Sequence, residues 1–189
     1  IENAASACAL AELWFGRQAD DVRHLVAVTV SEGIGVGLLV NGQLVHGRGA
    51  MAGEFGHVTL DENGPPCSCG KSGCWERYAS NSAAARFYQE LSGDGPVAGQ
   101  PAVPRAALRI DDILRLADEG DRRAVKTLEH VAHYLGIGLA NIVTGLAPQV
   151  VIIVGEVTAA WDRIGPIVLD VVKRRTLQTN TTPIVPTDP

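Results

Sequence analysis

The sequence predicts an α/β fold, in which helices pack on a sheet that contains antiparallel and parallel strands. Short β-branched runs suited to buried strands alternate with longer segments of helical period. The chain has 189 residues, of which 46% are hydrophobic. This composition suffices for one domain with its own core or for two small lobes. No internal repeat is present, so a repeat architecture is not expected.

The first predicted element is an amphipathic helix over Ala4–Phe15. Asn3 can cap its beginning, and Gly16 can end it. Cys8 stands alone in this apolar run and is expected to be a buried structural thiol. The residues predicted to share the apolar face of this helix are Ala7, Leu10, Ala11 and Trp14.

Three strands are predicted next, at residues 24–30, 35–40 and 43–46. Asn41 and Gly42 separate the second strand from the third, and this pair favours a two-residue type I′ hairpin turn. The three strands should therefore form an antiparallel corner.

Ser80 or Asn81 can cap a helix that reaches about Leu91. A Gly/Pro/Ala-rich stretch then runs to Pro104 and indicates an exposed excursion. The segment 92–108 is too short to be a linker between independent domains.

The remaining pattern predicts two further helices, a strand and a last helix. Asp111 and Asp112 can open a short helix. A continuous β-branched run at Val150–Val154 is typical of a parallel strand buried on both faces, and a helix is expected over about 159–176. Before that strand, one apolar face continues over some six helical turns until Pro148. Its residues are Val125, Leu128, Ala132, Leu135, Leu139, Ile142 and Leu146.

The segment between the third strand and the Ser80 helix has the composition of a metal site. It places Cys67, Cys69 and Cys74 within eight residues, with His57 just upstream. Structural zinc takes four Cys or His ligands in a tetrahedron, and these four residues supply that number. With four protein ligands the site would be closed, so the zinc should staple the loop and not activate water.

The neighbouring residues favour the same interpretation. Gly70 and Gly73 allow backbone angles that a Cβ resists, and Pro65-Pro66 stiffens the approach to the cysteines. The alternatives are a disulfide or unrelated buried thiols. A disulfide between Cys67 and Cys69 would close a very small strained ring and leave an odd thiol.

Charge and hydropathy exclude several classes of partner. The net charge of −5 and the pI near 5.5 provide no basic surface for nucleic acid. No apolar run reaches the length of a membrane span, and no signal peptide precedes the first element. The cysteines suggest a reducing compartment, so a cytoplasmic location is expected. Because the chain opens on Ile1 and not on methionine, we expect it to be a piece of a longer protein.

Three motifs occur in an order that resembles the ROK family of sugar kinases and sugar-responsive transcriptional repressors. They are AGEFGH at 52–57, CSCGKSGCWE at 67–76 and LGIGLANIV at 135–143. The resemblance implies the two-lobed actin-like ATPase, ribonuclease H-like fold, with residues 1–189 as its C-terminal lobe and zinc-stapled loop. An N-terminal lobe and any DNA-binding winged helix would then lie upstream of Ile1. The family also suggests a homo-oligomer, either a dimer or a tetramer.

The resemblance further implies a sugar site beside the zinc, formed by Asn3, Glu54, His57 and Glu76. The chemistry agrees, since carboxylates accept hydroxyl donors and an imidazole can bind metal through one nitrogen and donate through the other. The alternatives are that Asn3 is a helix cap only and that the two glutamates are solvated surface carboxylates.

The same comparison indicates departures from the family's kinases. Their asparagine is followed by a catalytic aspartate, whereas Asn3 is followed by Ala4, which cannot accept a proton. Their glycine-threonine-glycine phosphate turn corresponds here to Ser31-Glu32-Gly33, and their late diglycine to Gly155-Glu156. Carboxylates would repel phosphate at both places, unless the two glutamates point to solvent.

We therefore expect the sugar-binding half of a ROK-type regulator that does not phosphorylate its ligand and does not use ATP. DNA binding would belong to a module outside this chain. The enzyme alternative is an ATP-dependent sugar kinase, similar to a glucokinase, that uses another base. A third hypothesis is a zinc-stapled assembly module that binds no ligand.

Overall fold

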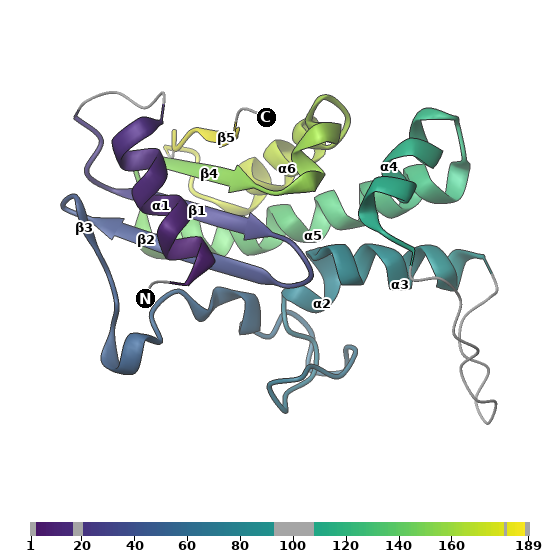
Figure 1. Cartoon of the computed structure of the whole chain (residues 1–189), viewed down its shortest axis with the longest axis horizontal. Coiled ribbons are helices and arrows are strands. Elements are labelled where there is room, and N and C mark those ends of the chain that lie inside the picture. The colour runs from purple at the N-terminus through teal and green to yellow at the C-terminus, as the bar shows by residue number, and fades with distance from the viewer. Residues whose placement is uncertain (1–2, 17–20, 93–107, 180, 188–189) are drawn as a thin grey trace.

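The computed structural model describes residues 3–16, 21–92, 108–179 and 181–187. Figure 1 shows a central sheet with helices on both of its faces. Its helices are α1 Ala4–Phe15, α2 Glu76–Ala79, α3 Asn81–Leu91, α4 Ile110–Asp118, α5 Arg122–Leu146 and α6 Trp161–Arg175. Short 3-10 turns are η1 Arg48–Ala50, η2 Glu54–His57 and η3 Glu156–Ala160. The excursion predicted to reach Pro104 lies, except for Ser92, outside the described residues.

The described strands form one mixed sheet in the order β3-β2-β1-β4-β5. They are β1 Leu25–Val30, β2 Ile34–Val40, β3 Gln43–Leu44, β4 Val150–Val154 and β5 Ile184–Pro186. The pairs β1–β2 and β2–β3 are antiparallel, whereas β4 runs parallel to β1 and β5 runs parallel to β4. The α/β class, the antiparallel corner and the parallel strand are thus confirmed. The strand β5 was not predicted, because a three-residue strand that ends in proline carries little periodicity.

The turn between β2 and β3 has the predicted type I′ character. Asn41 has φ 54° and Gly42 has φ 73°, so both central residues are left-handed. The third strand was predicted two residues too long, since β3 ends at Leu44 and the chain then leaves the sheet edge toward η1.

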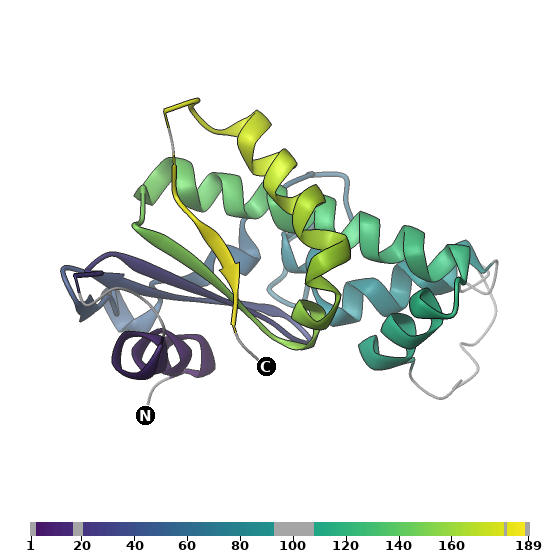
Figure 2. The ribbon, with the colours of Figure 1, turned by 90° about the horizontal axis from the view of Figure 1, so that it is seen from above.

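Figure 2 shows from above that α1 lies on one side of the sheet and that α5 and α6 lie on the other. Alternating strand residues contribute to these two layers. One face of β1 and β4 packs on α1 through Leu25, Ala27 and Ile152. The opposite face belongs to the larger core with α5 and α6, to which Val26, Val28 and Ile153 contribute. This period of two places the two helical layers on opposite sides of the sheet.

The buried face of α1 was predicted wrongly. Ala5, Ser6 and Ala9 are buried, whereas Ala7 and Ala11 are exposed and Trp14 is 67% exposed. The reason is the closeness of the helix to β2, because a Cβ on Gly37 would lie 2.2 Å from the Ala5 carbonyl oxygen. Only small residues fit such an approach, and this steric demand overrides the larger apolar residues. Cys8 is correspondingly half-buried and not fully buried.

The predicted central helix is confirmed as α5. Of its predicted apolar face, Val125 is half-buried and Leu146 is exposed at the two ends. The fully buried members are Leu128, Ala132, Leu135, Leu139 and Ile142. The last helix, α6, is two residues shorter at its start than predicted, since Glu156–Ala160 forms the 3-10 turn η3.

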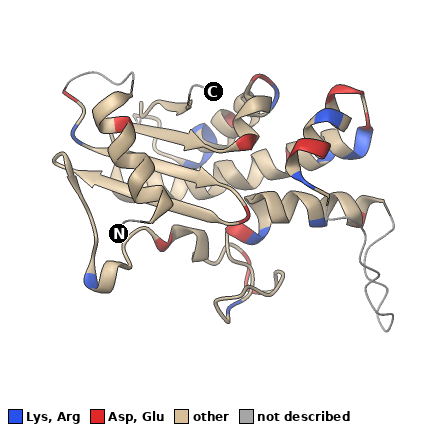
Figure 3. Cartoon of the chain, viewed as in Figure 1, with Lys and Arg blue, Asp and Glu red and all other residues tan. Residues whose placement is uncertain are grey.

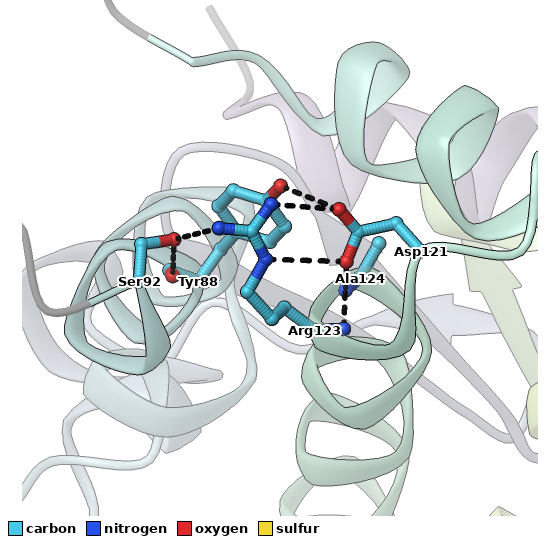
Figure 4. Close-up of polar contacts among 5 residues, drawn as sticks. All are labelled: Tyr88, Ser92, Asp121, Arg123 and Ala124. Atoms are coloured by element: carbon cyan, nitrogen blue, oxygen red, sulfur yellow. Dashed lines mark hydrogen bonds and ion pairs between the residues drawn. The ribbon is translucent and has the colours of Figure 1, made fainter.

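The start of α5 is joined to the end of α3 by a polar cluster, which Figure 4 shows. The Asp121 carboxylate caps the helix by accepting from the backbone of Arg123 at 2.7 Å and of Ala124 at 3.3 Å. Tyr88 donates to Asp121 at 3.1 Å, and the Arg123 guanidinium donates to the Ser92 hydroxyl at 3.2 Å. The Arg123 side chain and backbone hold the pKa of Asp121 well below its usual range.

None of the helices in the described part of the chain combines the length and hydropathy that a bilayer span requires.

The C-terminal end of α5 offers a test of backbone strain. Ala147 is left-handed, with φ 43° and ψ 54°. Since glycine adopts this conformation without a Cβ penalty, Ala147→Gly should stabilise the fold by about 0.5–1 kcal/mol and raise Tm by about 2 °C. Ala7→Gly, at an exposed position inside α1, is the matched control and should lose about 1 kcal/mol. Thermal melts check both, and a lower Tm for Ala147→Gly than for the parent would contradict the strain.

Candidate metal centre and sugar site

The loop after η2 folds back on itself and brings its two ends together. Isolated bridges pair Thr59 with Cys74 and Pro66 with Ser72. Gly73 has φ 66°, and a Cβ there would lie 1.6 Å from the Asp61 carbonyl oxygen. Gly70 is also left-handed, with φ 89°. The predicted role of these two glycines in closing the loop is therefore confirmed.

The four predicted metal ligands meet at one point of this loop. The ligand atoms of His57, Cys67, Cys69 and Cys74 all lie within 4.8 Å of one another. His57 Nδ1 is 3.6 Å from Cys67 Sγ, and Cys69 Sγ is 3.6 Å from Cys74 Sγ. A tetrahedral zinc with ordinary bond lengths separates nitrogen and sulfur ligands by about 3.6 Å and two sulfurs by about 3.8 Å. The four cysteines of the chain are free, so the disulfide alternative does not describe this structure.

The electrostatics of the cluster also suit a cation. Burial and the neighbouring thiols raise the pKa of Cys74 to about 12, and a nearby cation would favour its thiolate form. The backbone N–H of Lys71 lowers the pKa of Cys69. The Lys71 ammonium donates to the His57 carbonyl oxygen at 2.7 Å, which fixes the histidine backbone against the cysteine loop. The donor set and its spacing thus fit a closed metal site.

Two carboxylates flank the histidine. Glu54 Oε2 lies 3.8 Å from His57 Nε2, and Glu76 Oε1 lies 3.7 Å from His57 Nδ1. The Cys67 thiol donates to Glu76 Oε1 at 3.2 Å. Because Nδ1 faces the sulfurs, metal binding through Nδ1 would leave Nε2 free beside Glu54. The side chain of Glu54 is 53% exposed and that of Glu76 is 17% exposed, so a polar ligand could reach the first while the second is held.

Asn3 is placed by its capping role. Its Oδ1 accepts from Ser6 N at 2.8 Å, so the helix-cap alternative describes its oxygen in this structure. Its described hydrogen bond therefore does not join it to Glu54, His57 or Glu76. The helix that Asn3 caps and the turn that carries Glu54 and His57 nevertheless pack on the same half of β2. Helix α1 approaches β2 through Ala5, and the η2 turn lies against Ile34. Ala4, the first residue of α1, is exposed.

Glu32 and Glu156, the two glutamates of the turns compared above with the phosphate turns of the family's kinases, both contact the N-terminal end of α3. Glu32 Oε2 accepts from the Ser82 hydroxyl at 2.6 Å, and Glu156 Oε2 accepts from Asn81 Nδ2 at 3.1 Å. Both residues remain exposed, yet neither carboxylate is only solvated. Figure 3 shows acidic residues at this end of the sheet, on the β1–β2 turn and directly after β4.

Trp75 has a positioning role that was not predicted from the sequence. This side chain is 1% exposed, and its indole N–H donates to the Tyr134 carbonyl oxygen at 2.8 Å. It packs where Gly138 leaves room in α5. Since Trp75 stands between Cys74 and Glu76, it anchors one metal ligand and one carboxylate to the core. A tryptophan next to a cysteine, together with a glycine inside a long apolar helix, was the available signal.

Two cavities of the described residues lie away from this site. The first, about 670 Å³, is lined by the end of α5 and by Leu177, Thr179 and residues 181–183, and the second adjoins α6. No proposed sugar or metal residue lines either of them. The cluster around His57 is partly open to solvent, since Glu54 is 53% exposed, whereas Cys67 and Cys74 are buried.

The fold and the site define a class of protein: a mixed-sheet α/β lobe that carries a three-cysteine, one-histidine loop beside two carboxylates. The model of the ROK family matches residues 1–188. The chain therefore belongs to the ROK family, and the predicted resemblance is confirmed.

Its relatives include both kinases and repressors. A glucokinase of Halalkalibacterium halodurans is 36% identical over 166 residues, which are 86% of this chain and 50% of that protein. A xylose repressor of Bacillus subtilis strain 168 is 39% identical over 153 residues, which are 81% of this chain and 36% of the repressor. The solved ROK hexokinase from Thermus thermophilus superposes with a TM-score of 0.84 at 30% identity, covering 99% of this chain and 61% of that one. The chain thus spans half or less of the length of these two curated relatives.

Proposed function

We propose that this chain is the sugar-sensing part of a ROK transcriptional regulator, which binds a sugar or sugar derivative without phosphorylating it. The observation that carries the proposal is the approach of two carboxylates, Glu54 and Glu76, to the histidine of a candidate metal centre. His57, Cys67, Cys69 and Cys74 would hold a structural zinc. Sugar contacts would come from Asn3, Glu54, His57 and Glu76.

The sugar chemistry follows from the donors and acceptors available. Each carboxylate can accept from two sugar hydroxyls, and His57 Nε2 can donate to a sugar oxygen when Nδ1 binds the metal. The Asn3 amide nitrogen can donate while its oxygen caps α1. Because the Glu54 and His57 side chains are 53% and 30% exposed, we propose that residues outside this chain would complete the pocket.

The absence of phosphorylation is proposed because the base is missing. Ala4 occupies the position where the family resemblance places a catalytic aspartate, and a methyl group cannot take the proton of an attacking hydroxyl. Losing such a base typically lowers a rate by about 10² to 10⁴. ATP is accordingly not expected as a ligand.

The glucokinase relative favours a second candidate, an ATP-dependent sugar kinase that uses another base. DNA binding, as in a repressor, would depend on a module outside this chain, whose net charge is −5. A homo-oligomer, dimer or tetramer, and a cytoplasmic location remain part of the proposal. The third candidate, an assembly module without ligand, predicts no heat on titration with any sugar.

Titration calorimetry with hexoses, pentoses and amino sugars tests the sugar site. Glu54→Gln and Glu76→Gln should each weaken binding about 10- to 100-fold, because each removes a charged acceptor for sugar hydroxyls. Glu62→Gln, at an exposed position of the same loop, is the matched control and should leave the affinity unchanged. Equal affinities for all three variants would remove the two carboxylates from the site.

A kinase assay tests the absence of phosphorylation. The full-length protein should show no sugar-dependent ATP hydrolysis, and Ala4→Asp should restore none or only a trace, because the missing base is not the only departure. ADP release measured with and without sugar decides the matter. Sugar-dependent turnover by the unmodified protein would overturn the regulator proposal in favour of the kinase.

A further inference from the structure

The Glu76 carboxylate is contacted on two sides by different parts of the fold. Its Oε1 accepts from the Cys67 thiol at 3.2 Å and lies 3.7 Å from His57 Nδ1, so this oxygen faces the candidate metal centre. Its Oε2 lies against Gly33, in the turn between β1 and β2, where a Cβ would be only 2.8 Å away. The turn therefore contacts the oxygen that faces away from the metal loop, and this contact was not predicted from the sequence.

The start of β2 also supports the segment that carries Glu54 and His57. A Cβ on Gly56, which lies between these two residues, would be 2.3 Å from the carbonyl oxygen of Ile34. Ile34 is the first residue of β2 and follows Gly33 directly. Both parts of the proposed sugar site thus lie against residues 33–34, and each of the two contacts depends on a missing side chain.

The two contacts differ in what an added methyl group would displace. At Gly56 the obstructing atom belongs to the backbone of β2, so a side chain there would disturb the packed sheet. At Gly33 it belongs to the end of a flexible side chain, and the next atom of Glu76, its Cδ, is 3.9 Å away. Gly33 is not one of the left-handed glycines, so alanine suits its backbone. A methyl group at position 33 would therefore move the Glu76 carboxylate and leave the strand in place.

We propose that Gly33 is a positioning residue for Glu76, because its missing side chain lets the carboxylate lie between the β1–β2 turn and the metal loop. The inference rests on the proposed function for its ligand, a molecule with several hydroxyl groups. Since Oε1 is directed to Cys67 and His57, Oε2 is the oxygen that accepts from a sugar hydroxyl. Any side chain at position 33 would take the space of this oxygen.

Gly33→Ala tests the contact in the full-length protein without any ligand. Crystal structures of the parent and the variant should differ at Glu76, whose carboxylate should turn away from the new methyl group while β2 stays unchanged. Tm should change by less than about 2 °C, because the displaced group is flexible. Gly145→Ala is the matched control, with nothing within 4 Å of its Cβ, and should leave Glu76 in place. A Glu76 carboxylate that keeps its position in Gly33→Ala would overturn the inference.

Sugar titrations show whether this position matters for binding. Gly33→Ala should weaken the affinity for the sugar that the parent binds by about tenfold or more and leave the metal content unchanged. Glu76→Asp has a carboxylate one methylene shorter, which lies farther from position 33. On this background Gly33→Ala should cost less than about threefold, and such non-additivity is the mark of a direct contact. Equal losses on the two backgrounds would overturn the inference.

The two measurements separate this inference from the proposed function. A parent protein that binds no sugar would overturn the sugar site, and the crystal structures would still decide the role of Gly33. A displaced carboxylate with unchanged sugar affinity would uphold the contact and remove Glu76 from the proposed sugar site. A loss of sugar affinity with the carboxylate in its parent position would overturn the role of Gly33 alone.

Discussion

Replacing Cys74 by serine should abolish the proposed metal binding and destabilise the whole lobe. Cys74 is fully buried, and the residue after it, Trp75, is part of the main core. Closed zinc sites bind with apparent free energies of about 10–16 kcal/mol, and this energy stabilises the folded loop. Because the loop is joined to the core, we expect a loss of about 3–5 kcal/mol and a Tm lower by about 10 °C. Elemental analysis of the purified protein and thermal melts measure the two effects.

The matched control is Cys8→Ser, which changes the one cysteine outside the cluster. Cys8 is half-buried in α1, so its replacement should cost less than about 1 kcal/mol and leave the metal content unchanged. The sugar affinity of Cys74→Ser should also fall, since the metal would hold His57 in the orientation that frees Nε2. One equivalent of metal retained in Cys74→Ser, or a parent protein that binds none, would refute the metal centre.

Gly138→Ala should be the most damaging single-methyl change in α5. A Cβ at this position would lie 1.9 Å from the Trp75 ring, and the indole has no free space because it is 1% exposed and bonded to Tyr134. Overpacking of this kind costs about 1–3 kcal/mol or more, which corresponds to a Tm lower by about 5–10 °C. A displaced Trp75 would also move its neighbours Cys74 and Glu76, so metal affinity should decrease together with stability. Thermal melts and competition with a metal chelator measure both quantities.

Gly145→Ala provides a control of opposite sign on the same helix. Nothing lies within 4 Å of a Cβ built there, so the substitution gains helix propensity without a clash. It should raise stability by about 1 kcal/mol, or Tm by about 2–4 °C, and leave metal affinity unchanged. If both variants melted alike, the contact between Gly138 and Trp75 could not be what positions the metal loop.

Local sequence signals predicted the elements where one local effect dominates. Asn41-Gly42 determines its turn because both residues must be left-handed. The Val150–Val154 run is uniformly β-branched, which favours a buried strand over a helix. The face of α1 could not be predicted in the same way, because two apolar faces exist and the close approach of Gly37 selects the smaller one. The strand β5 was missed for the opposite reason, since its position depends on pairing with β4 and not on its own pattern.

The candidate site was likewise predictable where residue types alone indicate the chemistry. Residue types alone predicted the four ligands, because three sulfurs and an imidazole have few other uses at that spacing, and the structure brings them within 4.8 Å. The sequence also assigned Glu54 and Glu76 to the neighbourhood of His57, and both lie beside it. Their contacts with sugar, and the binding of zinc by the four ligands, stay predictions.

By itself the sequence determined the class of fold and predicted the four candidate metal ligands, since both follow from residue identity and short spacing. The prediction that Ala4 replaces a catalytic base depends on the family resemblance. Only the tertiary structure decided that Glu32 and Glu156 both contact the N-terminal end of α3. Glu32 and Glu156 are far apart in the chain, and their arrival at Asn81 and Ser82 depends on the parallel pairing of β1 with β4. Long-range pairing of this kind is a property of the packed sheet, so no local sequence pattern could have predicted it.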